Sequence, residues 1–264
     1  MSNHIDISSL PISIQLHTLR EEMAKDPIET LRRVARIGFK FVEPASLFNI
    51  SPREFRKTVE DLGMQIGSSH SPWAGHQEIA KTIDVAGELG LKQVVGGYMQ
   101  DGFADLDAIK STADKVNELQ ESLAQAGFEL FLHNHWWEFA PIEGRLAIDH
   151  LLDLCPTIKL ELDLYWAAHF GDQDVPALMR RLKDRIVLLH VKDGDFSPIQ
   201  GAPLLALGDG KMDLPACLAE TDADRVGYYV FEMDRCATDY WEATEKSFRY
   251  LETLAGSSVE EATR

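Results

Sequence analysis

The feature that most constrains the fold is a unit of about 27 residues that recurs along the chain while its letters change. Short β-rich segments end in a polar residue or a glycine, and the next segment ends one unit later. The first four of these positions are separated by 26, 27 and 27 residues: His17, Glu43, His70 and Gly97. Asp163 and His190 are again 27 residues apart. A period of this length is that of one strand, one helix and their connections, so the chain is expected to repeat a βα unit.

Eight segments have the composition of buried strands. They read as nearly continuous apolar runs, which is typical of a parallel sheet covered by helices. The segments are 11–17, 39–44, 64–70, 91–97, 128–135, 157–163, 185–191 and 227–233. The stretches between them are amphipathic, and in 175–184 the apolar residues fall at i, i+3, i+4 and i+7, which predicts a helix.

Glycines mark the expected helix ends. Four of them follow an amphipathic stretch and shortly precede a strand, where a left-handed C-cap would fit: Gly38, Gly63, Gly90 and Gly127. Eight βα units in a chain of this length predict an α/β fold, a (β/α)8 TIM barrel. We expect a single domain over 1–264, with 256–264 as a frayed polar tail. No G-x-G-x-x-G turn follows a strand, which argues against a dinucleotide-binding sheet.

The charge of the chain excludes several partners. It carries 43 acidic and 26 basic residues, a net charge of −17, which repels nucleic acids and anionic lipids. Three cysteines without C-x-x-C spacing predict neither a disulfide framework nor a cysteine zinc site. No signal peptide is recognisable, and no apolar run approaches the ~18 residues that span a bilayer. We therefore expect a cytoplasmic protein with a small-molecule partner, no nucleic acid and no membrane.

Ionisable residues gather where the last four strands end, in "HNHWWEF", "ELDLYW", "LLHVKDGD" and "VFEMDR". The carboxyl ends of barrel strands form the active-site face, so Glu138, Asp163, His190 and Glu232 are expected to converge. Three carboxylates and an imidazole suit Mn²⁺, Mg²⁺ or Co²⁺, and Zn²⁺ remains an alternative. Such a cation would also relieve the repulsion among the carboxylates.

These motifs, together with "LDLYWAAHFG" and "LGDGKMDLPACL", resemble the xylose isomerase-like TIM barrel family of sugar phosphate isomerases and epimerases. That family includes ketose 3-epimerases and inosose dehydratases. The resemblance covers nearly the whole chain and implies one divalent metal ion, usually Mn²⁺. It places the ligands at Glu138, Asp163, His190 and Glu232. The first is the weakest correspondence, because His133 and His135 compete with Glu138 for the metal or for the substrate.

The expected activity is that of a metal-dependent isomerase or epimerase acting through an enediolate on a ketose or keto-sugar. A metal that polarises a carbonyl makes the neighbouring C–H acidic enough for a carboxylate to remove its proton. The resemblance suggests that Glu138 and Glu232 act both as ligands and as proton carriers. Lys192 lies two residues after His190, on the same strand face, and could stabilise the developing oxyanion. Alternatively, Lys192 forms an ion pair with Asp193 or Asp195.

Further polar and aromatic residues are candidates for substrate contacts. They lie at or just beyond the expected strand ends, and each has an alternative role in packing or in a loop ion pair. These candidates are His135, His70, Glu43, Trp166, His169 and Arg235.

Two other functions are compatible with the same sequence, which argues against a third. The enediolate could expel a β-substituent, as in a lyase or dehydratase acting on a keto-inositol, keto-sugar or 3-keto-glycoside. A noncatalytic barrel could bind a sugar. An abasic-site endonuclease shares the fold but requires many histidines and a basic face, which nine histidines and a charge of −17 do not provide. The resemblance is also compatible with a homo-oligomer.

Overall fold

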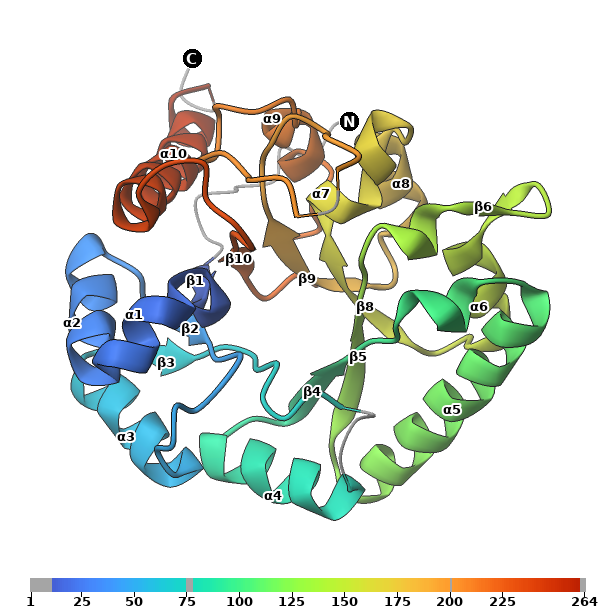
Figure 1. The fold of residues 1–264 in the computed structure, drawn as a ribbon, viewed down its shortest axis with the longest axis horizontal. Helices are drawn as coiled ribbons and strands as arrows, with labels where there is room; N and C mark the ends of the chain where they lie inside the picture. The colour runs from blue at the N-terminus through green and yellow to red at the C-terminus, as the bar shows by residue number, and fades with distance from the viewer. Residues whose placement is uncertain (1–10, 75–77, 200, 262–264) are drawn as a thin grey trace.

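The computed structural model describes residues 11–74, 78–199 and 201–261. Its centre is a parallel sheet of eight strands in the order β3-β2-β1-β10-β9-β8-β5-β4, and Figure 1 shows these strands curled in a ring inside the helices. The strands are β1 Ile12–Gln15, β2 Phe41–Glu43, β3 Gln65–Ile66, β4 Gln93–Gly96, β5 Glu129–His133, β8 Lys159–Asp163, β9 Ile186–Val191 and β10 Tyr229–Phe231. Each lies inside one of the eight predicted segments, so the predicted barrel is confirmed.

The ring closes between β3 and β4 through a short connection. Ala74 forms a parallel bridge with Gly96, and its N–H donates to the Val95 carbonyl oxygen at 2.9 Å. The side-chain amide of Gln93 donates to the Gly67 carbonyl oxygen at 2.8 Å. A Cβ atom on Gly96 would lie 2.6 Å from the Ala74 carbonyl oxygen, so only glycine permits this approach.

Helices follow the strands and cover the outside of the ring (Figure 1). They are α1 Arg20–Lys25, α2 Pro27–Ile37, α3 Pro52–Asp61, α4 Ile79–Leu89, α5 Leu106–Gln125, α6 Ala147–Leu154, α7 Leu164–Ala167, α8 Val175–Leu182, α9 Leu214–Leu218 and α10 Tyr240–Glu261. Asp26 and Ser51 cap α2 and α3 by accepting backbone N–H groups at the third helical position. The four predicted glycines after helices all have positive φ, as expected for residues that end a helix.

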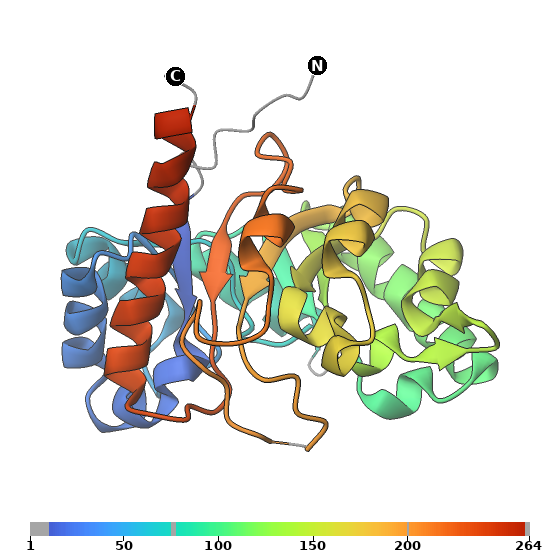
Figure 2. The same cartoon turned by 90° about the horizontal axis from the view of Figure 1, so that it is seen from above.

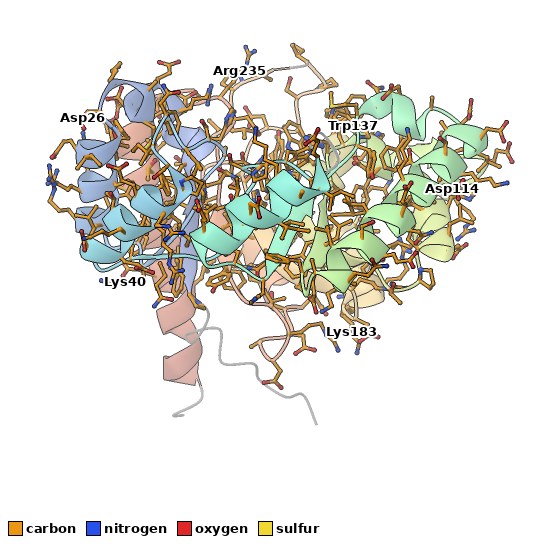
Figure 3. The ribbon with its side chains drawn as sticks, turned by 90° about the horizontal axis from the view of Figure 1, so that it is seen from below. Asp26, Lys40, Asp114, Trp137, Lys183 and Arg235 are labelled. Carbon is orange, nitrogen blue, oxygen red and sulfur yellow. The ribbon has the colours of Figure 1, made fainter. Side chains whose placement is uncertain are left out.

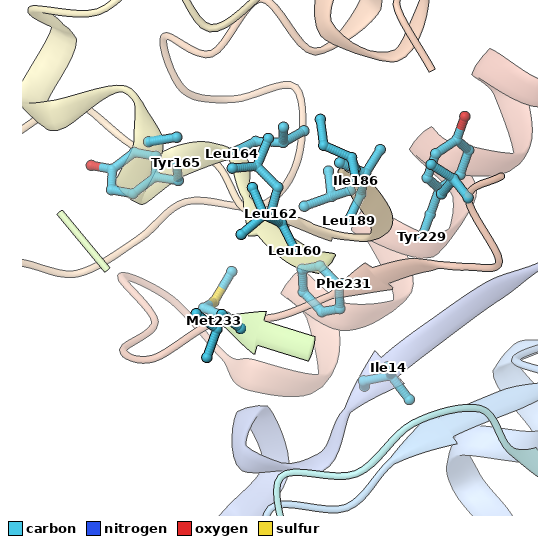
Figure 4. Close-up of a cluster of buried hydrophobic side chains, with 14 of the residues drawn as sticks. Ile14, Leu160, Leu162, Leu164, Tyr165, Ile186, Leu189, Tyr229, Phe231 and Met233 are labelled. Carbon is cyan, nitrogen blue, oxygen red and sulfur yellow. The ribbon is translucent and has the colours of Figure 1, made fainter. Parts of the chain in front are cut away.

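The core lies between the strands and the outer helices. Leu160 and Leu162 of β8, Leu189 of β9 and Phe231 of β10 are at most 2 % exposed, and Figure 4 shows them packed together. Their aliphatic and aromatic side chains hold adjacent strands in register. This rigid packing fixes the positions of the residues that follow each strand.

Irregular segments extend from the carboxyl ends of the strands. A small hairpin, β6 Pro141–Ile142 and β7 Arg145–Leu146, follows β5 and was not predicted. The connection from β9 to α9 projects beyond the strands on the side away from both termini (Figure 2). Trp137 and Arg235 lie at this face, opposite Lys40 and Lys183 (Figure 3).

Helix α10 includes the first part of the segment expected to fray, and residues 262–264 lie outside the described part of the chain. Among the described residues, no helix combines the length and apolar character needed to cross a membrane.

Candidate metal centre and active-site pocket

A cavity of about 330 Å³ opens at the carboxyl ends of the strands. Its walls come from segments far apart in the sequence, so the barrel fold assembles it. Residues that line it include His17, His70, His133, His135, Trp166, Lys192, Glu232 and Asp234. Five of the predicted functional residues therefore face one cavity: His70, His135, Trp166, Lys192 and Glu232.

Four buried side chains at the base of this cavity form a set that could hold a metal ion. They come from the ends of β5, β8, β9 and the residue after β10: His133, Asp163, His190 and Glu232. One potential ligand atom from each lies within 4.8 Å of the others. Asp163, His190 and Glu232 were predicted as ligands, and the structure brings them together.

The structure places Glu138 differently from the expected first ligand. It belongs to η4, Trp137–Phe139, and is only 3 % exposed. Its Oε2 accepts a hydrogen bond from the His135 backbone N–H at 2.9 Å. Burial raises the pKa of Glu138 to about 8. Glu138 is not among these four converging residues and does not line the cavity, whereas His133 is among them and lines it.

His133, and not Glu138, converges with the other potential ligands because of the geometry of the segment that contains both residues. β5 ends at His133, and strand alternation directs His133 and His135 toward the cavity. Asn134 points elsewhere: its side-chain oxygen accepts the Asp163 N–H at 2.9 Å, and its amide donates to the Asp163 carbonyl at 3.1 Å. This double hydrogen bond fixes β5 against the end of β8. The chain then turns into η4, which carries Glu138 away from the ligand atoms.

A second set of potential ligands overlaps the first and includes a residue that sequence reasoning missed. It comprises His70, His133, Glu161 and His190. Glu161 is fully buried, and its Oε2 lies 2.6 Å from His70 Nε2, 3.0 Å from His133 Nδ1 and 3.4 Å from His190 Nε2. The sequence contained the signal, because Glu161 lies two residues before Asp163 and therefore on the same face of the strand.

Glu43 lies beneath the cavity and does not line it. It is fully buried, and its carboxylate accepts a hydrogen bond from the Gln15 amide at 2.6 Å and another from the Ser68 hydroxyl. His190 Nε2 lies 2.9 Å from Glu43, and His190 Nδ1 lies 2.9 Å from Glu232. Burial opposes a charge on His190, but the surrounding carboxylates outweigh it and hold its pKa well above the ordinary value.

Lys192 places a buried ammonium group next to the carboxylates of the site. It is 1 % exposed, and its Nζ lies 2.9 Å from Asp163, 2.7 Å from Glu232 and 2.8 Å from Asp234. Burial opposes its charge, but these carboxylates outweigh burial and hold the pKa of Lys192 well above its usual value. The lysine is therefore a fixed positive charge at the cavity wall.

The alternative expected for Lys192, an ion pair with Asp193 or Asp195, is not what the structure shows. The carboxylate of Asp193 accepts backbone N–H groups of Gly194, Gly208, Gly210 and Met212. Asp193 thus organises the connection between β9 and α9, and Lys192 is left to pair with carboxylates of the cavity.

The residues present fit a divalent cation. Asp163 Oδ2 is buried and accepts no hydrogen bond of good geometry, although Lys192 Nζ lies 2.9 Å away. Burial raises the pKa of Asp163 to about 6, although the nearby Lys192 and His190 act to lower it. Two imidazoles and two carboxylates are a donor set that Mn²⁺, Co²⁺ and Zn²⁺ accept.

Two predicted substrate contacts lie away from the cavity. Arg235 is exposed, and its guanidinium packs against Gly201, where a Cβ atom would lie 2.9 Å from Arg235 Cζ. His169 lies 6.3 Å from Trp136 between ring centroids and does not line the cavity. Both residues follow their strands by several positions, so strand periodicity gave no information on where their loops place them.

Comparisons with known proteins agree with this architecture. The model of a family described as xylose isomerase-like TIM barrel matches residues 31–254. No curated protein matches the sequence.

Three solved structures resemble the chain in fold. A sugar phosphate isomerase/epimerase from Parabacteroides distasonis has a TM-score of 0.74 and 24% identity, covering 92% of this chain and 93% of that one. The probable 3-DHS dehydratase AsbF from Bacillus anthracis has a TM-score of 0.72 and 13% identity, with coverages of 92% and 98%. The 3-keto-D-glucoside 4-epimerase YcjR from E. coli has a TM-score of 0.66 and 17% identity, with coverages of 93% and 100%. At these identities the likeness is one of fold.

Proposed function

Because the chain belongs to the xylose isomerase-like TIM barrel family, we propose that it is a metal-dependent isomerase or epimerase of a ketose or keto-sugar. The observation that carries this proposal is the convergence of His133, Asp163, His190 and Glu232 at the base of the cavity. A cavity of about 330 Å³ suits a small polyol, and its wall of imidazoles, carboxylates and one ammonium provides partners for hydroxyl groups.

We place the ion among these four residues and not in the overlapping set. In the overlapping set, the Glu161 oxygen nearest the histidines already lies within hydrogen-bond distance of two imidazoles. Each set also contains one buried carboxylate oxygen without a hydrogen bond, Glu161 Oε1 or Asp163 Oδ2, but the set with Asp163 offers two carboxylates to a divalent cation and the overlapping set only one. Mn²⁺ is the proposed ion, with Mg²⁺, Co²⁺ and Zn²⁺ as alternatives. When bound, it would polarise the substrate carbonyl and thereby acidify the adjacent C–H.

The protein residues would move the proton and stabilise charge. The nearby Lys192 and His190 outweigh the effect of burial and hold the pKa of Glu232 well below its usual value, so its carboxylate is ionised. Glu232 also lines the cavity, and it is the proposed base. The Lys192 ammonium would stabilise the negative charge that develops on the substrate oxygen.

Epimerisation also needs a group that returns the proton to the other face. The sequence suggested Glu138, but Glu138 does not line the cavity. His135 does line it, and its buried Nδ1 has no hydrogen-bond partner. Burial lowers the pKa of His135 to about 4, so its imidazole is neutral at pH 7. It would therefore return a proton as a relay, with one ring nitrogen giving its N–H proton to the substrate while the other takes one from solvent. We therefore assign this role to His135.

The same first step would serve a lyase, and a dehydratase is among the structures of similar fold. Incubation of the Mn²⁺-loaded protein with ketopentoses, ketohexoses and 3-keto-D-glucose in D₂O tests both reactions by NMR and mass spectrometry. An epimerase returns an intact sugar with one solvent deuterium at the inverted carbon, whereas a lyase yields a product lighter by one water. Absence of both products and of deuterium exchange across this panel would contradict an enzymatic role.

A further inference from the structure

A second cavity, of about 170 Å³, lies beside the first at the same end of the barrel. Its wall is built from the segment after β5, the α7 region after β8 and the connection after β9. The large side chains of this wall are aromatic or aliphatic: Trp136, Tyr165, Trp166, Phe170, Ile199 and Leu204. We call it the aromatic side cavity.

The aromatic side cavity adjoins the sugar cavity through a shared wall. Trp166 lines both cavities. Lys192, a wall residue of the sugar cavity, has its Nζ 5.5 Å from the centroid of the Trp166 ring. The adjacent residues His135 and Trp136 line one cavity each. A substituent on a sugar in the first cavity could therefore reach the second cavity past a single indole.

Two phenylalanines beside this cavity have strained backbone conformations. Phe170 and Phe196 adopt left-handed conformations, with φ of 61° and 57°, which bulky residues rarely adopt. In these conformations the ring centroid of Phe170 lies 5.4 Å from that of Trp136. The ring of Phe196 stacks on Tyr165, with 5.6 Å between their centroids. Unfavourable conformations persist where the surroundings require them, and they cluster at binding sites.

The wall of the aromatic side cavity offers few polar groups to a ligand, which favours an apolar occupant. Among the residues that the structure describes, no charged side chain lines the aromatic side cavity. The Tyr165 hydroxyl already accepts the Phe196 N–H at 3.1 Å, and the Ser197 hydroxyl accepts the Ile199 N–H at 3.3 Å. A second sugar ring would bring several hydroxyls that need partners, whereas a planar apolar ring needs none.

We propose that the aromatic side cavity binds the aryl ring of an aryl keto-glycoside whose keto-sugar ring occupies the neighbouring cavity. An apolar cavity of about 150 Å³ is large enough for benzene, so the volume of about 170 Å³ accommodates one such ring. This inference rests on the proposed sugar activity and narrows its substrates to keto-glycosides with an aromatic aglycone. Ile199, which is 72% exposed, then acquires a role as the outer edge of the ring site.

The test uses calorimetry with the Mn²⁺-supplemented protein to compare phenyl β-D-glucoside, methyl β-D-glucoside and phenol. The two glucosides lack the keto group and serve as unreactive analogues of the keto-glycosides. Two variants obstruct the aromatic side cavity: Ala202→Phe fills it, and Ile199→Asp places a charge at its edge. Ala219→Phe, an exposed position outside both cavities, is the matched control. We expect phenyl β-D-glucoside to bind the unaltered protein at least tenfold tighter than methyl β-D-glucoside. Both cavity variants should reduce this ratio below threefold, while binding of methyl β-D-glucoside changes less than twofold.

Equal affinity for the two glycosides, or a tenfold ratio that survives in both folded variants, would overturn the aryl site and leave the sugar activity standing. Phenol binding that Ala202→Phe abolishes, combined with no binding of either glycoside and no turnover in the keto-sugar panel, would overturn the sugar activity and the joined site while leaving an isolated aromatic site. The two failures are therefore distinguishable.

Discussion

Lys192 Nζ lies 2.7 Å from Glu232 Oε2, and both groups are almost completely excluded from solvent. The proposed base is thus held next to the charge that would stabilise the product of its reaction. The same ammonium also contacts Asp163 and Asp234, so it balances several buried carboxylates at once.

Replacing this lysine should destabilise the protein and make its stability depend on metal. Removing one partner of a buried ion pair costs about 3–5 kcal/mol, because the remaining charge stays buried without compensation. Lys192→Met should therefore lower Tm strongly, and added Mn²⁺ should raise Tm more in this variant than in the unaltered protein. Differential scanning calorimetry with and without Mn²⁺ measures both effects. The exposed Lys183→Met is the control and should change neither; an unchanged Tm in Lys192→Met would contradict the buried network.

Glu138 should make the protein less stable as the pH rises. Burial raises its pKa from 4.5 to about 8, so the folded protein keeps a proton that the unfolded chain releases above pH 4.5. The free energy of unfolding should consequently fall between pH 4.5 and about 8, by an upper limit of about 5 kcal/mol. Glu138→Gln keeps an acceptor for the His135 N–H and cannot ionise. Urea denaturation at pH 5 and pH 8 should show the variant gaining stability over the unaltered protein at pH 8 only; an equal difference at both pH values would show that Glu138 does not titrate in this way.

Glu161 should act by orienting the histidines that surround it. Partners that orient metal-binding imidazoles typically contribute 10–100-fold to metal affinity. Glu161→Gln should therefore weaken Mn²⁺ binding within that range, as measured by calorimetry, without abolishing it. Asp163→Asn provides the comparison, because it removes a proposed ligand and should weaken binding more. If Glu161→Gln and His70→Ala weaken binding more than Asp163→Asn, the ion lies in the overlapping set that includes Glu161.

The barrel could be predicted from the sequence because strands and helix ends are marked by local sequence patterns. Apolar runs identify the eight strands, and Gly38 or Gly90 marks a helix end through its own backbone preference. Asp163 is the last residue of β8 and His190 the penultimate residue of β9, so their convergence follows from the barrel alone. Glu232 directly follows β10, so the convergence of strand ends in the barrel also places it at the site.

Residues beyond the strand ends were harder to place because their positions depend on loop conformation. Glu138 lies only five residues after His133, yet the turn into η4 removes it from the ligand atoms. Phe170 reaches the aromatic side cavity through a left-handed backbone that no propensity indicates. The cytoplasmic location and a homo-oligomer stay predictions from the sequence.

The central claim is that His133 supplies the metal ligand of the fifth strand, and Mn²⁺ binding tests it most directly. Calorimetry and Mn²⁺ electron paramagnetic resonance would be applied to the unaltered protein, His133→Ala and Glu138→Gln. We predict one Mn²⁺ per chain, an affinity reduced at least 100-fold in His133→Ala, and an affinity within threefold of the unaltered protein in Glu138→Gln. The opposite ranking of the two variants, or no Mn²⁺ binding by the unaltered protein, would contradict the account.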